Sequence, residues 1–273
     1  MQRIMVATDL STNHHDLFAT ALRLALASHA QLRVVHVHDE DTATDWHKLP
    51  TVRSLLSQWG LIDENATLED FEELGLKVMP VDLSRKGDLS WELVVRAHDA
   101  NPDLVIMATG GRVGLDRMMN PSVAEPVARS WGGPTLVVNE KGSNLVDSNG
   151  NLKLRKVVIP IDASVPQQPV IDAIAGLLQS IDQAPVEFVL LHVGRVDGIP
   201  AFELPDRTDW MWRSEVVNGS VVEAILELAA VEGADLIAMG TQGHDSLMDT
   251  LRGSTTERVM RRAACPLLAV PVH

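Results

Sequence analysis

The chain has 273 residues, 45% of them hydrophobic, and a formal net charge of −14. This length allows one large domain or two modest ones, and the acidity argues against general nucleic-acid binding, which needs a basic surface. Cys265 is the only cysteine, which excludes a disulfide framework and a cysteine zinc cluster. No apolar run approaches the roughly 18 residues of a membrane span. The opening "MQRIMVATDLS" lacks signal-peptide features, so we expect a cytoplasmic protein without membrane contact.

The chain repeats itself. "RIMVATDLS" at its start matches "KVVIPIDAS" at 156–164, and three more pairs follow in the same order. These are "LRVVHVHDE" with "EFVLLHVGR", "NPDLVIMATGG" with "EGADLIAMGTQG", and "GGPTLVVNE" with "ACPLLAVPV". The matches predict a duplicated domain of about 130 to 140 residues. We therefore expect domains at 1–140 and 154–273, joined by a linker at 141–153 that is rich in Asn, Gly and Ser.

Each half alternates apolar strands with helical patterns. The first half is longer between its second and fourth strands, where "TVRSLLSQWGLI" predicts a helix. In the second half the predicted strands are 156–162, 186–193, one near 212–217, 235–239 and 267–272. The predicted helices are 166–181, 220–232 and 254–264, the last two with capping boxes at Ser220/Glu223 and Ser254/Glu257. Continuous apolar strands separated by helices indicate an α/β fold with a parallel sheet covered on both faces.

A glycine-rich loop lies where such a sheet binds ligands, beyond the carboxyl ends of its strands. Gly240 and Gly243 flank the turn that leaves the fourth strand, and Gly253 precedes Ser254 at the next helix start. A helix start offers unpaired N–H groups and a positive dipole end, so this loop is predicted to hold phosphate. Asp162, which ends the first strand of this half, could accept hydrogen bonds from a ribose or a base. The Walker and G-x-G-x-x-G patterns are both absent.

The spacing Gly240-x2-Gly243-x9-Gly253-Ser254, with "PIDAS" at the head of the domain, resembles the universal stress protein family. The resemblance covers nearly the whole chain as two tandem copies. It implies two Rossmann-like domains, each an open five-stranded parallel sheet flanked by helices, with ATP bound in the ATP-binding members. The residues implied for the site are Pro160, Ile161 and Asp162 facing adenosine, Val193 lining the adenine pocket, Met239, Gly240 and Gly243 at the ribose and first phosphates, and Gly253, Ser254 and Thr255 at the remaining phosphates.

The first half departs from this motif. Ala108 stands where the second half has Gly240, and Pro121 stands where it has Gly253. Thr8 is taken as the counterpart of Pro160. Proline supplies no N–H and fixes its own φ, so Pro121 cannot copy a glycine that approaches phosphate. We expect the first half to bind ATP poorly or not at all.

The expected function is that of a stress-response sensor or adaptor that binds ATP or another adenine nucleotide, possibly with Mg²⁺. It would act on an unknown protein partner, and a homodimer is also expected. In the family the last strands of each repeat, here "TLVVNE" and "LLAVPV", often pair across a pseudo-two-fold axis. One chain could therefore mimic a dimer of single-domain proteins. No catalytic residue and no metal ligand is assigned.

Several alternatives stay open. The chain could be a slow ATPase or self-phosphorylating enzyme, or a structural stress protein without ligand. A nucleotidyl transferase would need an H-x-G-H signature, which neither half has. Asp162 could instead cap the helix 166–181. The four histidines His14, His15, His36 and His38 could gather at one rim of the sheet, where ordinary hydrogen bonding is favoured over a metal site.

Overall fold

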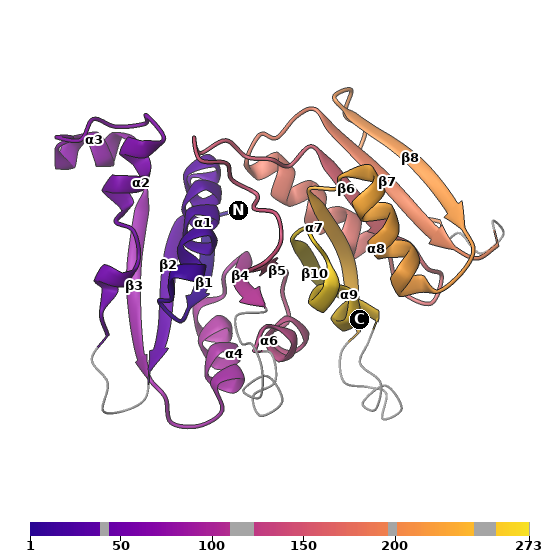
Figure 1. The fold of residues 1–273 in the computed structure, drawn as a ribbon, viewed down its shortest axis with the longest axis horizontal. Helices are drawn as coiled ribbons and strands as arrows, with labels where there is room; N and C mark the ends of the chain where they lie inside the picture. The colour runs from indigo at the N-terminus through magenta and orange to yellow at the C-terminus, as the bar shows by residue number, and fades with distance from the viewer. Residues whose placement is uncertain (39–43, 110–122, 196–200, 243–254, 273) are drawn as a thin grey trace.

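The computed structural model of the chain describes residues 1–38, 44–109, 123–195, 201–242 and 255–272. Its strands form one ten-stranded sheet in the order β3-β2-β1-β4-β5-β10-β9-β6-β7-β8, which runs across the molecule in Figure 1. The strands are β1 Arg3–Thr8, β2 Gln31–His38, β3 Lys77–Ser84, β4 Leu104–Thr109, β5 Thr135–Asn139, β6 Lys156–Pro160, β7 Val186–Val193, β8 Trp210–Val217, β9 Leu236–Gln242 and β10 Leu267–Val272.

The sheet consists of two five-stranded parallel halves, as predicted, and they join through their last strands. Every neighbouring pair is parallel except β5 and β10, which pair antiparallel. The seam aligns Leu268 with Leu136. This is the pairing implied by the family resemblance, and it occurs within one chain. Association of two chains stays a prediction.

Helices cover both faces of the sheet. They are α1 His15–Ser28, α2 Val52–Gln58, α3 Leu68–Glu73, α4 Leu89–Ala100, α6 Ala124–Ser130, α7 Gln168–Ser180, α8 Val221–Glu232 and α9 Thr255–Arg262, with short 3-10 turns η1 Thr12–His14 and η2 Trp46–Lys48. Strand side chains alternate between two buried cores. Ile4 belongs to the core that also contains residues of α1, α2 and α7, and Met5 belongs to the core that contains residues of α4, α6, α8 and α9. Each core contains residues from both halves, which explains the continuous apolar strands.

The duplication extends to individual hydrogen bonds. The carboxylate of Asp103 accepts the backbone N–H of Arg3 at 2.9 Å, and that of Asp235 accepts the N–H of Lys156 at 2.9 Å. In return the N–H of each aspartate donates to the carbonyl of the same partner, at 2.8 and 2.9 Å. Each aspartate therefore fixes the amino end of β1 or β6 to the neighbouring strand.

The segment 141–153, predicted as a linker, is packed against both halves, and the N–H of Ser143 donates to the carbonyl of Ala264 in the second half at 2.7 Å. Val146 and Leu152 form an isolated antiparallel bridge, and the Nε of Arg23 donates to the carbonyl of Gly150 at 2.6 Å. Gly150 has φ +79°, and a Cβ there would meet the Trp59 ring at 2.5 Å. Here glycine meets the demands of a tight turn under a tryptophan. The domain boundaries on either side stay a prediction.

Several local predictions are corrected. The Ser220/Glu223 capping box is wrong: Ser220 makes no side-chain cap bond, and the Glu223 carboxylate instead binds Arg262 of α9 at 2.6 and 2.7 Å. The strand placed near 212–217 is longer, since β8 begins at Trp210. Ser254, the cap expected for α9, lies outside the described residues.

Candidate functional site

The predicted site lies at the carboxyl ends of β6 and β9, which are neighbours in the sheet. From β6 the chain crosses to β7 on one side, while β9 lies on its other side. In open α/β sheets the crevice at such a change of direction is where ligands bind. The corresponding place in the first half lies between β1 and β4.

A loop held by its own hydrogen bonds follows β6. The Oδ1 of the exposed Asp162 accepts the N–H of Ser164 at 2.8 Å. The buried Gln167 closes the loop, because its Nε2 donates to the carbonyls of Asp162 and Val165, each at 2.8 Å. Gln167 is the N-cap residue of α7 and makes no side-chain cap bond. Asp162 therefore forms a turn within the loop, and the alternative that it caps this helix is wrong.

His192, which the sequence analysis did not identify, stabilises the same edge of the sheet at the carboxyl ends of the strands. Its Nδ1 lies 3.1 Å from the carbonyl oxygen of Ile161 and donates a hydrogen bond to it. This bond ties the end of β7 to the chain leaving β6 and sets the place of Val193, the last residue of β7. The sequence repeat could have indicated this role of His192, because His36 occupies the matching place on β2. The Nδ1 of His36 lies 2.9 Å from the carbonyl oxygen of Thr8. These bonds match Thr8 with Ile161, so the match of Thr8 with Pro160 was wrong by one residue.

Gly240 allows the close packing of β9 against its neighbours. A Cβ at Gly240 would lie 3.1 Å from Val165 and 3.3 Å from Val272, tighter than most real Cβ contacts. The carbonyl of Gly240 accepts a 2.8 Å hydrogen bond from the hydroxyl of Thr256, a buried residue in the first turn of α9. The start of α9 is thereby fixed beside the end of β9.

The next residue, Thr241, carries a buried hydroxyl. Thr241 is 8% exposed, and its Oγ1 has no hydrogen-bond partner within the described part of the chain. Because strand side chains alternate, Thr241 lies on the same face as Met239, which packs in the core with α9. A buried hydroxyl without a partner is unusual and costly. Thr241 is therefore a candidate ligand group that the glycine spacing did not reveal.

The other predicted site residues fall into two groups. Pro160, Ile161, Met239 and Thr255 are described, and the side chains of Ile161 and Met239 are buried in the two cores. A ligand would meet these two through their backbones. Gly243, Gly253 and Ser254 lie outside the described residues.

The first half builds its rim from different side chains. His14 stands where the second half has Gln167, and its Nδ1 accepts the N–H of Asp9 at 3.1 Å. The Nε2 of His14 faces Glu140 at 3.4 Å, and Asn13 donates to the same carboxylate at 3.1 Å. Glu140 stands where β10 has Val272, and its side chain is only 8% exposed. This rim holds a nearly buried carboxylate, which disfavours a polyphosphate.

Asp9 repeats the turn of Asp162, because its Oδ1 accepts the N–H of Ser11 at 2.8 Å. Burial acts to raise the pKa of the Asp9 carboxyl. Hydrogen bonds from Ser11 and the charges that His14 and His36 can carry outweigh burial, so its pKa is lowered. This carboxylate stays ionised and adds negative charge to the first rim.

The histidines have ordinary partners. The Nε2 of His15 lies 2.7 Å from the carbonyl of Lys48, and His38 pairs with Asp82 at 3.3 Å. Among the described residues, no group of three or more His, Cys, Asp or Glu side chains is arranged to hold a metal ion. Nothing in this part of the chain supports the alternative of a metal site in the first half.

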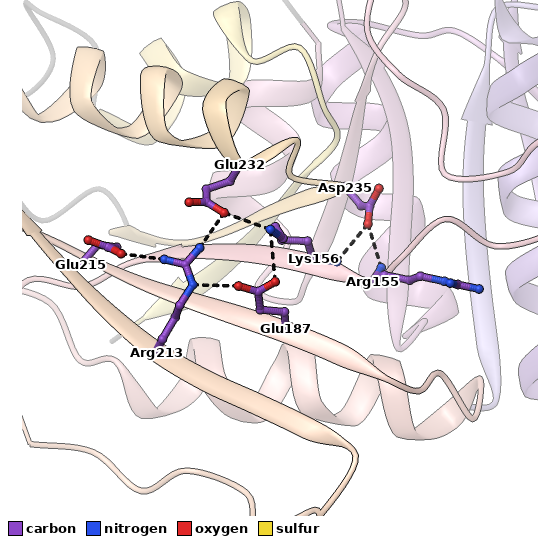
Figure 2. Close-up of polar contacts among 7 residues, drawn as sticks. All are labelled: Arg155, Lys156, Glu187, Arg213, Glu215, Glu232 and Asp235. Carbon is purple, nitrogen blue, oxygen red and sulfur yellow. Dashed lines mark hydrogen bonds and ion pairs between the residues drawn. The ribbon is translucent and has the colours of Figure 1, made fainter.

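An ionic network lies at the opposite, amino end of the second half (Figure 2). Lys156 pairs with Glu187 and Glu232 at 3.1 and 2.9 Å, and Arg213 contacts both glutamates and Glu215. Hydrogen bonds from these cations lower the pKa of Glu187, with Arg213 the larger cause, and of Glu232, with Lys156 the larger cause. The network joins β8, the edge strand, to β6, β7 and α8 and lies away from the predicted site.

No helix in the described ranges is long and apolar enough to cross a membrane. The model of the universal stress protein family matches residues 1–139 and 211–271. Universal stress protein MJ0531 of Methanocaldococcus jannaschii is 28% identical over 149 residues, which span 46% of this chain and 88% of that protein.

A solved structure that spans the whole chain agrees on the fold. A universal stress protein from Archaeoglobus fulgidus overlaps 99% of this chain and 96% of its own, with a TM-score of 0.66 and 18% identity. A universal stress protein determined in complex with cAMP overlaps 51% of this chain and 97% of its own, with a TM-score of 0.33 and 21% identity. With its two joined five-stranded halves and a family match over most of its length, this chain belongs to the universal stress protein family.

Proposed function

We propose that the second half of the chain binds ATP or a related adenine nucleotide at the carboxyl ends of β6 and β9. The arrangement at the start of α9 carries the proposal. The Thr256 bond to Gly240 fixes the first turn of α9 beside β9, and the unpaired hydroxyl of Thr241 follows directly. Helix N–H groups and a spare hydroxyl suit phosphate oxygens.

The exposed carboxylate of Asp162 supplies the other end of the site. An ionised carboxylate only accepts hydrogen bonds, and ribose hydroxyls or the adenine amine are donors. Its Oδ1 already accepts the N–H of Ser164, which holds the side chain in place. Val193 ends the adjacent strand, where a base could lie against it. The predicted contacts of Gly243, Gly253 and Ser254 belong to this proposal, as does any Mg²⁺ that accompanies the triphosphate.

The first half is proposed to bind no nucleotide. Glu140 and Asp9 place two carboxylates at its rim, and Pro121 replaces the glycine that precedes the helix. Binding in the second half would make the protein a cytoplasmic sensor or adaptor whose partner surface responds to nucleotide.

Titration calorimetry of the purified chain with ATP tests the proposal. We expect about one equivalent per chain, and Gly253→Pro should abolish binding because it removes an N–H and fixes φ. Nucleotide released from the purified protein, identified by mass, names the ligand, and release of inorganic phosphate separates an ATPase from a binder. Absence of adenine-nucleotide binding would refute the proposal, and two equivalent sites would refute the assignment of the first half.

A further inference from the structure

Two reciprocal ion pairs cross the seam between the halves. Arg261 of α9 binds the carboxylate of Glu125 in α6, and Arg129 of α6 pairs with Glu257 of α9. The four residues are equivalents, because Glu125 and Arg129 precede Pro134 as Glu257 and Arg261 precede Pro266. The helices α6 and α9 lie on either side of the seam in Figure 1, where α6 packs on β10 and α9 on β5.

The two pairs differ in which end of α9 they hold. Arg261 is in the last turn of α9, remote from its N-terminus. Glu257 is in the first turn, two residues after Thr255 and next to Thr256, which binds the carbonyl of Gly240. The Arg129–Glu257 pair therefore acts on the turn that the proposed nucleotide site uses.

The carboxylate of Glu257 opposes the binding of an anion at the start of α9. A carboxylate in the first turn is attracted by the same positive dipole end that would attract phosphate. Its side chain is only 13% exposed, so water screens its charge incompletely. The guanidinium of Arg129, at 26% exposure, places a positive charge against it. Removing Arg129 would take away the positive charge that lies against this carboxylate, so the electrostatic potential at the first turn of α9 would become more negative.

We propose that Arg129, a residue of the first half, completes the nucleotide site of the second half by holding and neutralising Glu257. Arg129 is a positioning residue: it touches Glu257 and acts on the ligand through it. This inference rests on the proposed nucleotide site. It gives the first half a part in binding although that half holds no nucleotide of its own.

The test compares matched variants across the same seam. Arg129→Gln removes the charge beside the first turn of α9, and Arg261→Gln removes the equivalent charge beside its last turn. Arg129→Lys keeps the charge, and Arg129→Gln combined with Glu257→Gln removes both partners. Affinity for ATP, ADP and AMP is measured by calorimetry on each full-length variant, at a temperature where its thermal unfolding curve shows it folded.

We expect Arg129→Gln to weaken ATP binding at least about fivefold, the lower end of typical coupling between sites. The loss should shrink from ATP to ADP to AMP as phosphates are removed. Arg261→Gln should stay within about twofold of the unaltered chain, and so should Arg129→Lys and the double variant, since such a difference lies below typical coupling.

Three results would overturn the inference. The first is an unchanged ATP affinity in Arg129→Gln. The second is an equal loss of ATP affinity in Arg261→Gln, which would indicate a loosened seam. The third is a double variant that binds ATP as weakly as Arg129→Gln. If the unaltered chain binds no adenine nucleotide, both the proposed function and this inference fail. If the unaltered chain binds normally and any of the three results is found, only the role of Arg129 is rejected.

Discussion

Leu136 and Leu268 lie directly opposite each other where β5 pairs with β10. They occupy the same place in the two repeats, each two residues after Pro134 or Pro266. An antiparallel pair made of equivalent residues marks a pseudo-two-fold axis. Both side chains are buried, at 0% and 1% exposure. The chain therefore contains, within itself, the self-complementary interface that a symmetric dimer would form.

Leu136→Ala and Leu268→Ala should destabilise the chain by similar amounts, each about 2–5 kcal/mol for a buried leucine truncated to alanine. Because both side chains lie in one core shared by the two halves, the loss should affect both halves together. Denaturant unfolding, followed by hydrogen exchange in each half, measures this. If Leu268→Ala exposed only residues of the second half, the halves would be independent units.

Asp162 can be tested with two substitutions that separate its roles. Asp162→Asn keeps an oxygen to accept the N–H of Ser164 but loses the charge, whereas Asp162→Ala loses both. Both should weaken ATP binding by about 1.5–3 kcal/mol, the scale for hydrogen bonds to charged groups. Only the alanine variant should also lose about 1 kcal/mol of stability, the net contribution of a typical intramolecular hydrogen bond.

The matched control for this pair is Asp9→Asn in the first half, where Asp9 makes the same turn with Ser11. It should leave nucleotide affinity unchanged, because that rim is proposed to be empty of nucleotide. Calorimetry and thermal unfolding on the same samples give both quantities. Normal ATP affinity in Asp162→Asn would remove the charge of Asp162 from the site.

The central strands were predictable because both of their faces are buried, whereas the edge strands β3 and β8 are largely exposed. "VVIP" in β6 and "LLAVPV" in β10 read as continuous apolar runs, and the repeats fixed their order. The seam followed from the family resemblance. The sequence could not predict which side chains form pairs when they lie far apart in the chain. Glu223 has the spacing of a capping box, yet it binds Arg262 of the neighbouring helix.

The candidate site shows the same division. The spacing of Gly240 and the place of Asp162 were readable, because strand ends and helix starts follow from local pattern. The role of the Thr241 hydroxyl could not be predicted from the sequence. Only its burial beside the start of α9 distinguishes Thr241 from an ordinary strand threonine. The different charge of the two rims was not predictable either, because it depends on the contact between His14 and Glu140, which lie far apart in the chain.

The ionic network around Arg213 should make stability depend on acid and salt. The pKa values of Glu187 and Glu232 are lowered from 4.5, so their contribution is present above about pH 4.5 and is lost as pH falls through the lowered values. Arg213→Met, which introduces the residue type that the first half has at the equivalent Met79, should be less stable at pH 7. The difference should shrink toward pH 3, where the carboxylates are protonated, and in high salt, which screens the charges.

Urea unfolding of the unaltered and Arg213→Met chains at several pH values gives this difference directly. Arg262→Met is the control, because its partner Glu223 lies in an exposed pair at the surface of α8 and α9. A difference between the unaltered chain and Arg213→Met that is constant from pH 7 to pH 3 would mean that Arg213 stabilises by packing its stem and not by its charge.

Cys265 should be inert in the folded chain and should report unfolding. Burial raises the pKa of its thiol from 9.0 to about 11, so almost no thiolate exists at neutral pH. A thiol reagent at pH 8 should label the folded chain only as fast as it opens, and the urea-unfolded chain at once.

Above about pH 9 the unfolded chain ionises this thiol while the folded chain still binds its proton, so the stabilising contribution falls as pH rises through about 11. The chain has no tyrosine to titrate in the same range, which leaves lysine as the main background. Cys265→Ala should therefore show a shallower loss of stability between pH 8 and 11 than the unaltered chain, measured by urea unfolding. Equal slopes, or rapid labelling of the folded protein, would show that Cys265 is exposed to solvent.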